Sequence, residues 1–168
     1  ENHPEFTEKV IREFVFSGSR KRFFTGIGQA LAGCARDEMG EDAFKAHWHD
    51  IAFYNYIQEL VGEAARIRPT QPMWQDAFKP FLEIVETLRP TDIWVCGVGL
   101  WNNMPYEKDG ASFEDGPPPL GNPNEFNSGT YGFKKKRYRV FQSYHPSSSK
   151  FQWQNVHDYM KKALNQPL

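Results

Sequence analysis

Apolar side chains recur every three or four positions over two long stretches of the chain. In the first stretch, residues 3–18, this spacing predicts a helix that Thr7 caps and Gly18 ends. In the second stretch, residues 69–90, Thr70 is a favourable N-cap and Pro72 suits the first turn. Shorter helices are predicted from about Gly28 to Gly40, in the first half of Glu41–Gln58, and from Gln152 to Leu164.

Three other stretches have the pattern of β-strands. An aromatic run begins at about Ile51, and residues 91–101 form a continuous apolar run that is typical of a fully buried parallel strand. A third strand is predicted at Arg137–Ser143. Between the last two strands, residues 105–132 are rich in proline, glycine and asparagine, and they predict a long loop. This succession of strands and helices predicts the α/β class, as a sandwich with a mainly parallel central sheet.

Length and composition narrow the class of protein. A chain of 168 residues is most simply a single domain, residues 1–168. The net charge of −1 gives no overall positive field to attract nucleic acid, so local clusters must bind any anion. No apolar run approaches the roughly 20 residues of a membrane span, and no signal peptide is visible. We therefore expect a soluble, cytoplasmic monomer without a membrane partner.

The cysteine and histidine content argues against a metal centre. Cys34 and Cys96 cannot supply the four thiolates of an iron–sulfur cluster or of a thiolate zinc site. Cys96 also lies in an apolar strand pattern, which is typical of a buried reduced thiol. His47 and His49 stand at the end of a predicted helix, where residues two apart do not share a face. We expect no metal and no cofactor.

The segment "HPSSS" follows the third predicted strand, and ligands bind at the ends of strands in open α/β sheets. His145 can donate a hydrogen bond to developing negative charge or exchange a proton near neutral pH. Ser147, Ser148 and Ser149 offer hydroxyl and backbone N–H groups to an anion, such as a DNA phosphate, at the start of the last helix. The alternative is structural: the serines cap that helix and His145 belongs to a turn.

Two other sites are candidates for binding a planar ligand. Asn55 lies in the predicted aromatic strand, and its amide offers a donor and an acceptor, as the edge of a pyrimidine does. The alternative is a core amide satisfied by nearby backbone. Phe23 and Phe24 stand beside Gly26, before a predicted helix, so a ring can lie flat against a ligand that the backbone approaches closely. The alternative is that these rings belong to the core.

A basic run precedes the third predicted strand. Lys134, Lys135 and Lys136 are followed closely by Arg137 and Arg139. Such a run can contact the phosphates of DNA, or it can be an ordinary solvated face. Its closeness to "HPSSS" in the sequence favours phosphate binding.

Taken in order, four segments resemble the uracil-DNA glycosylase superfamily. "RFFTGIGQAL" resembles its base-stacking phenylalanine followed by glycine and a helix, and "IAFYNYIQELVGEAARIRPT" resembles its strand that ends in asparagine. "FKPFLEIVETLRPTDIWVCGVGLW" is similar to its helix and buried strand ending in glycine, and "YHPSSSKF" resembles its HPS motif. The superfamily's first strand leads to a motif that positions water. This chain begins too late to contain that strand intact, with Glu1 and His3 as a remnant of the motif at most. We expect either that the first strand and first motif lie upstream of residue 1 or that the motif is absent.

The resemblance implies a three-layer α/β/α fold that binds DNA and flips a damaged base into a pocket. It assigns His145 to the negative charge that develops on uracil, Asn55 to base recognition, and Phe24 or Phe23 to stacking. The expected function is hydrolysis of the N-glycosidic bond of uracil or another deaminated base in DNA. Two alternatives stay open: a catalytically silent module of the same fold that binds nucleic acid or a nucleobase, and an unrelated small-molecule enzyme.

Overall fold

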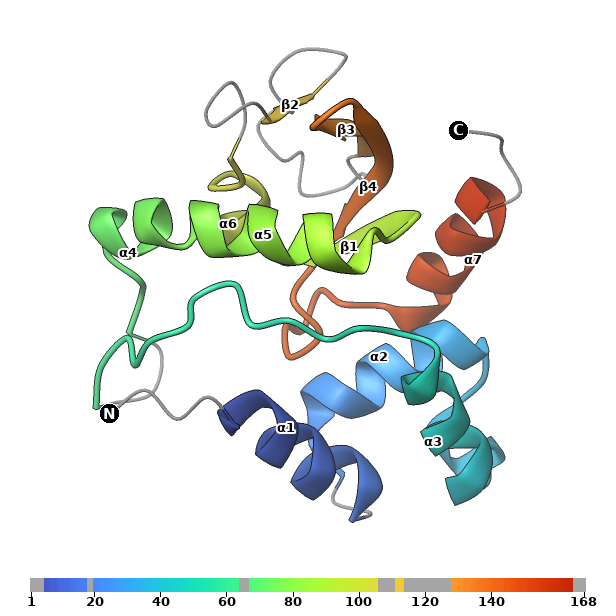
Figure 1. Ribbon diagram of the computed structural model, residues 1–168. Helices are drawn as coiled ribbons and strands as arrows, with labels where there is room; N and C mark the ends of the chain where they lie inside the picture. Colours follow the sequence, from blue (N-terminus) through green and yellow to red (C-terminus); the bar gives the residue numbers. More distant parts are fainter. Residues whose placement is uncertain (1–4, 18–19, 64–66, 106–110, 114–127, 165–168) are drawn as a thin grey trace. The chain divides into compact units, whose positions relative to one another are not determined.

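A computed structural model describes residues 5–17, 20–63, 67–105, 111–113 and 128–164 of the chain (Figure 1). These residues form two compact units. The first, called here the helical unit, comprises the described residues up to Tyr54 and those from Ser143 onward. The second, the sheet unit, comprises those from Asn55 to Gln142. The chain is of the α/β class, as predicted, whereas the expectation of a single domain stays a prediction.

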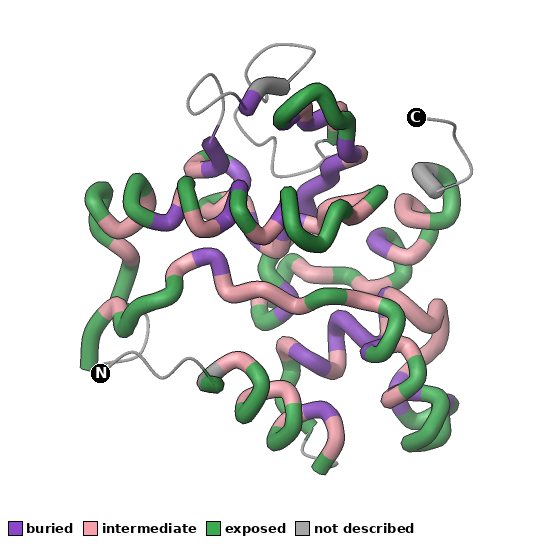
Figure 2. Tube along the Cα trace, in the orientation of Figure 1, coloured by how far each residue is buried: buried purple, intermediate pink, exposed green. Residues whose placement is uncertain are grey.

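The helical unit is built around α2. Its elements are α1 (Phe6–Ile11), a π-helical continuation of α1 (Arg12–Phe16), α2 (Arg22–Ala32), a 3-10 turn (Arg36–Glu38), α3 (Glu41–His49) and α7 (Trp153–Leu164). Helix α2 packs against both α3 and α7 (Figure 1). Phe24, Ile27 and Ala30 recur at helical spacing and are all buried, so one face of α2 faces the core (Figure 2).

The start of the chain differs in detail from the sequence prediction. The first helix begins at Phe6, so Thr7 lies inside it and does not cap it. Gly18, predicted to end the helix, lies outside the described residues. The helix predicted in the first half of Glu41–Gln58 is confirmed as α3.

Gly33 ends α2 and lets α7 pack closely against it. Its φ of 74° is in the left-handed region, where glycine meets no steric penalty. A Cβ at this position would lie 2.4 Å from the imidazole of His157 on α7. Nδ1 of the same imidazole lies 2.9 Å from the carbonyl oxygen of Ala30. These contacts tie two helices that are far apart in the sequence.

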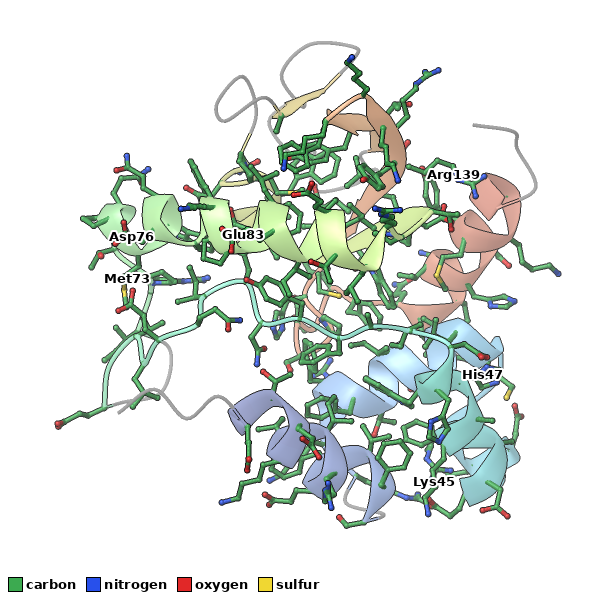
Figure 3. All side chains as sticks on the ribbon, viewed as in Figure 1. Lys45, His47, Met73, Asp76, Glu83 and Arg139 are labelled. Atoms are coloured by element: carbon green, nitrogen blue, oxygen red, sulfur yellow. The ribbon has the colours of Figure 1, made fainter. Side chains whose placement is uncertain are left out.

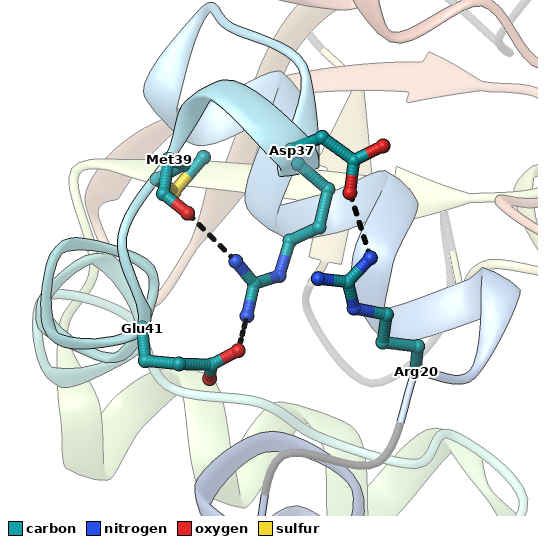
Figure 4. Close-up of polar contacts among 5 residues, drawn as sticks. Arg20, Asp37, Met39 and Glu41 are labelled. Atoms are coloured by element: carbon teal, nitrogen blue, oxygen red, sulfur yellow. Dashed lines mark hydrogen bonds and ion pairs between the residues drawn. The ribbon is translucent and has the colours of Figure 1, made fainter.

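Arg36 fixes the connection between α2 and α3 (Figure 4). Its buried guanidinium donates to the carbonyl oxygen of Met39 at 2.9 Å and pairs with the carboxylate of Glu41. In the same view, Arg20 pairs with Asp37 at 2.7 Å. A buried cation is tolerated only when it is paired and hydrogen-bonded in this way.

The sheet unit combines helices with a four-stranded sheet. Its elements are α4 (Gln71–Asp76), α5 (Phe78–Leu88), β1 (Asp92–Cys96), α6 (Val98–Trp101), β2 (Ala111–Phe113), β3 (Ser128–Phe133) and β4 (Lys136–Ser143), whose last residue is assigned to the helical unit. The strand order is β1-β4-β3-β2 (Figure 1). Helix α5 meets the sheet through Phe81, whose ring centroid lies 6.3 Å from that of Tyr131. Both residues are buried.

The prediction of a mainly parallel sheet is wrong for this sheet, because β2–β3 and β3–β4 are both antiparallel pairs. Only Lys134 and Lys135 join β3 to β4, and their φ angles are 47° and 64°. Positive φ at both central residues is the conformation of a type I′ hairpin turn. Such turns usually carry Asn-Gly or Asp-Gly, so the lysines gave no sign of the hairpin.

The predicted loop at residues 105–132 is also wrong in part. Strands β2 and most of β3 lie within it, and residues 106–110 and 114–127 of it lie outside the described residues. The hydroxyl of Tyr131 on β3 donates to the carbonyl oxygen of Pro105 at 2.7 Å. Burial, and secondarily the neighbouring Tyr56, raises the pKa of the Tyr131 hydroxyl well above its ordinary value.

The helices just before β1, α4 and α5, agree best with the sequence prediction. Thr70 caps α4 by accepting a hydrogen bond from the backbone N–H of Met73, a residue labelled in Figure 3, and this confirms the predicted cap. The single helix predicted at residues 69–90 is divided at Ala77 into α4 and α5. The strand predicted at residues 91–101 is confirmed in part, because β1 covers Asp92–Cys96 whereas residues 98–101 form α6. The expectation that this strand is fully buried is wrong, because Val95 alone among the residues of β1 is buried. Within the described residues, no helix has the length and apolar character needed to cross a membrane.

An ion pair links β1 to β4 in the sheet unit. Arg139, labelled in Figure 3, donates from Nε to Oδ1 of Asp92 at 2.6 Å and from Nη2 to Oδ2 at 3.1 Å. Its backbone N–H also donates to the carbonyl oxygen of Thr91 at 3.1 Å. This two-point contact is the geometry in which arginine binds a carboxylate best, so Arg139 is committed to the sheet rather than to a ligand.

Candidate functional site

Phe23 and Phe24 lie in the first turn of α2, not in a loop before it. The predicted loop is wrong because the helix already begins at Arg22. Phe24 is 7% exposed, and its ring lies 5.7 Å from that of Phe14 and 5.6 Å from that of Trp48. Phe23 is only half-buried. Phe24 is therefore a core residue, and Phe23 is the ring with surface to offer a ligand.

His145 lies directly against Phe23. Their ring centroids are 5.0 Å apart, with an angle of 41° between the ring planes. His145 is exposed, and its Nδ1 accepts a hydrogen bond from the backbone N–H of Ser147 at 3.2 Å. A ring nitrogen that accepts a hydrogen bond carries no proton, so neutral His145 has its proton on Nε2. The imidazole therefore presents Nε2–H as a donor.

The three serines fold into turns ahead of α7. The backbone N–H of Ser148 donates to the carbonyl oxygen of His145 at 2.7 Å. Helix α7 begins only at Trp153, so Ser147–Ser149 do not stand at its start and do not cap it, whereas their binding of a phosphate stays a prediction. The first and third serines are exposed, so their hydroxyl groups can still meet a phosphate.

Helix α2 and the "HPSSS" turn are packed against each other at two further points. A Cβ on Gly26 would lie 3.0 Å from Phe151 and 3.5 Å from Pro146, so glycine permits a close approach. Nη2 of Arg22 donates to the carbonyl oxygen of Ser148 at 3.0 Å. Sequence reasoning missed Arg22, although a cation directly before the two phenylalanines was the available signal.

Asn55 belongs to the sheet unit and lies in irregular chain. The aromatic strand predicted around it is wrong, because residues 51–63 form no strand. The aromatic side chains of this stretch pack against helices instead. Tyr56, for example, lies 5.9 Å from Trp74 and 5.4 Å from Phe81 between ring centroids. Asn55 is half-buried, and its role in base recognition stays a prediction.

The lysine run lies at the tip of the β3–β4 hairpin in the sheet unit. Nζ of Lys134 pairs with Glu86 at 2.5 Å. Lys135 and Lys136 are exposed and pair with no carboxylate within the described residues. Lys136 is the first residue of β4 (Lys136–Ser143), so the rest of that strand separates the run from the "HPSSS" turn along the chain.

Two histidines and two cysteines were the other candidates for metal or thiol chemistry. His47, labelled in Figure 3, lies on α3 together with His49, and residues two apart on a helix do not share a face. Within the described ranges, no three His, Cys, Asp or Glu side chains are grouped to hold a metal ion. Cys34 and Cys96 are free thiols. Burial raises the pKa of the Cys96 thiol from 9.0 to about 12, so it is not a nucleophile near neutral pH.

The helical unit thus brings together two of the predicted site residues, His145 and Phe23, beside the serine turn. Asn55 and the lysine run belong to the sheet unit. Comparisons with protein-family models, with curated proteins and with solved structures found no match. Functional inference therefore depends on the sequence resemblance and on the geometry around His145.

Proposed function

We propose that the chain is a DNA glycosylase-like protein that flips uracil or another deaminated base out of DNA and hydrolyses its N-glycosidic bond. The observation that carries the proposal is the contact between His145 and Phe23. A hydrogen-bond donor on an exposed imidazole lies beside a half-buried aromatic ring, with 5.0 Å between the ring centroids. A flipped base needs both, because the ring stacks on its face and the donor meets its polar edge.

In the proposed reaction, the bond between the base and the sugar breaks and its electron pair stays on the base. Negative charge therefore develops on a carbonyl oxygen of the base. Water supplies the hydroxyl group that the sugar carbon gains, and the remaining proton of that water neutralises the released base. Nε2–H of His145 donates to that oxygen, and the Ser147 N–H keeps the donor on Nε2. A single preorganised donor of this kind contributes roughly 100- to 1000-fold to a rate.

The rest of the proposal follows the sequence resemblance. Asn55 recognises the edge of the base, while exposed hydroxyl groups of Ser147 and Ser149 and the cations of Lys135 and Lys136 meet DNA phosphates. The proposal also includes the three-layer α/β/α arrangement of the superfamily. It is supported by the passage from α5 to β1 and then to Gly97 and α6.

The test is a strand-cleavage assay after alkali treatment, on an oligonucleotide with one uracil. Wild type, His145→Ala and His145→Gln are compared under single-turnover conditions, with His47→Ala on α3 as the matched control. We expect cleavage by wild type and by the control, and a rate lower by about 100-fold or more in both His145 variants. Binding of uracil-containing DNA without any cleavage would instead identify a silent binding module, and neither binding nor cleavage would overturn the proposal.

A further inference from the structure

Arg22 differs from the neighbouring arginines of the helical unit in what it binds. Arg20 pairs with Asp37, and Arg36 pairs with Glu41. Arg22 is exposed, and within the described residues its side chain makes one hydrogen bond, to the carbonyl oxygen of Ser148, and no ion pair. No carboxylate in the part of the chain that the structure describes therefore neutralises its positive charge, although its guanidinium is hydrogen-bonded to the serine turn.

The bond to Ser148 leaves most of the guanidinium available. A guanidinium has five N–H donors in one plane, and this bond uses one of them. The same carbonyl oxygen also accepts the backbone N–H of Phe151 at 3.2 Å. Because a carbonyl oxygen has two lone pairs, the turn keeps a bond of its own when Arg22 is replaced. The hydrogen bond to Ser148 therefore holds the Arg22 side chain, but the turn does not need Arg22 to keep its conformation.

The position of Arg22 relates it to the contact between Phe23 and His145. It directly precedes Phe23 on α2, and consecutive side chains of a helix point about 100° apart. Arg22 therefore lies to one side of the ring that touches His145, rather than behind it. A base stacked on Phe23 belongs to a nucleotide, and a nucleotide carries a phosphate beside its sugar.

We infer that Arg22 binds a phosphate of the DNA backbone next to the flipped nucleotide and so positions the base at His145. This inference rests on the proposed function. A planar guanidinium binds phosphate through two parallel hydrogen bonds, which fixes orientation as well as adding affinity. Phosphate contacts set the register of a protein on DNA without reading its sequence. Arg22 is therefore a positioning residue and not a catalytic one.

The test is the salt dependence of DNA binding, measured by fluorescence anisotropy on a duplex with one tetrahydrofuran abasic site. Wild type is compared with Arg22→Gln, which keeps an N–H donor for Ser148 but removes the charge. Arg22→Lys keeps the charge but loses the planar guanidinium. Arg20→Gln is the matched control on the same segment. Melting temperatures verify that all variants are folded.

Each phosphate contact contributes about 0.9 to the slope of log affinity against log salt concentration on duplex DNA. We expect Arg22→Gln to lower that slope by about 0.9, so that the affinity lost between 50 and 200 mM salt shrinks by roughly threefold. Arg22→Lys should keep the wild-type slope with weaker binding, and Arg20→Gln should leave both unchanged. An unchanged slope in a folded Arg22→Gln, or an equally lowered slope in Arg22→Lys, would overturn the inference alone. Failure of wild type to bind the duplex would overturn the proposed function together with it.

Discussion

The backbone N–H of Ser147 donates a hydrogen bond to Nδ1 of His145, across 3.2 Å. The two residues are separated only by Pro146, which is buried and has a fixed φ. The turn therefore sets the tautomer of the imidazole with its own backbone. The structural and the chemical interpretations of "HPSSS" do not exclude each other, because the contact that shapes the turn is also the one that places the proton on Nε2.

Replacement of the two neighbouring phenylalanines should separate ligand binding from folding. Phe24→Ala removes a buried ring and should lower the free energy of unfolding by about 3–5 kcal/mol. Phe23→Ala removes a half-buried ring, so it should cost clearly less stability and weaken binding of uracil-containing DNA. Thermal unfolding and DNA binding are measured on both variants. Equal losses of stability would mean that Phe23 is a core residue as well.

Asn55→Asp should change which base is accepted. The substitution replaces the amide donor with a second acceptor, which suits the N4 amino group of cytosine better than the edge of uracil. We expect the ratio of uracil to cytosine excision to fall by about 10- to 100-fold, which corresponds to roughly 1–3 kcal/mol for one mispaired polar group. Competition between the two oligonucleotides measures this ratio. Asn102→Asp, an exposed site in the same unit, is the control, and an unaltered ratio in Asn55→Asp would remove Asn55 as the reader.

The three lysines at the tip of the β3–β4 hairpin should contribute unequally to DNA binding. Lys135 and Lys136 are exposed, whereas Lys134 is paired with Glu86. Replacing Lys135 and Lys136 together by alanine should lower the salt slope on duplex DNA by about 1.8, and Lys134→Ala should lower it less. The double replacement of Lys161 and Lys162 on α7 is a control of equal charge. A slope that does not respond to the hairpin lysines would identify the run as a solvated face.

Gly28→Ala should destabilise the helical unit, although alanine favours helices more than glycine does. A Cβ at this position would lie 2.1 Å from the ring of Phe44. That ring is buried and lies 4.3 Å from the guanidinium of Arg36, so it has little room to move. We expect a loss of about 1–3 kcal/mol in the free energy of unfolding. Gly99→Ala, where a Cβ would meet nothing within 4 Å, should be neutral or slightly stabilising, and the same result at Gly28 would contradict the close packing.

Stability should decline in alkaline solution because of Cys96. Its pKa is raised from 9.0 to about 12 by burial, so the unfolded chain releases the thiol proton at a lower pH than the folded chain does. Between pH 9 and 12 the unfolded state binds fewer protons, and the free energy of unfolding falls by up to about 1.4 kcal/mol per pH unit for this group. Cys96→Ala should make that decline shallower. Urea unfolding at several pH values measures it, and Tyr131 leaves a residual decline in every variant because its pKa is raised as well.

The elements that sequence reasoning predicted correctly are those with a strong local signal. Thr70 with Pro72 predicted the start of α4, and the apolar run at residues 91–101 predicted a strand of which β1 is the first part. The wrong predictions concern segments whose structure depends on contacts between residues far apart in the sequence. Helix α2 begins at Arg22, before the predicted start at about Gly28, and it continues through Gly26 and Gly28. These two glycines let Phe151 and Phe44 approach the helix closely.

Two further failures have the same origin. The aromatic side chains within residues 51–58 pack against helices, and these residues form no strand. The alternation of side chains along this stretch could not show that it lacks a strand partner. The hairpin at Lys134 and Lys135 lacks the residues that usually adopt positive φ. For the candidate site, His145 and Phe23 were found from residue type and order. Arg22 was not found from the sequence, because it is a candidate only for lacking a carboxylate partner among the described residues, which the sequence cannot show.

The pairing of α2 with α7 also bears on how the chain is made. The contact between Ala30 and His157 spans 127 residues of sequence. A ribosome that adds about 5–20 residues per second therefore completes α2 roughly 6 to 25 s before it synthesises the partner helix. During that time the face of α2 that carries Phe24 and Ile27 has no α7 to cover it. We expect the nascent chain to engage ribosome-associated chaperones until its last helix emerges from the exit tunnel.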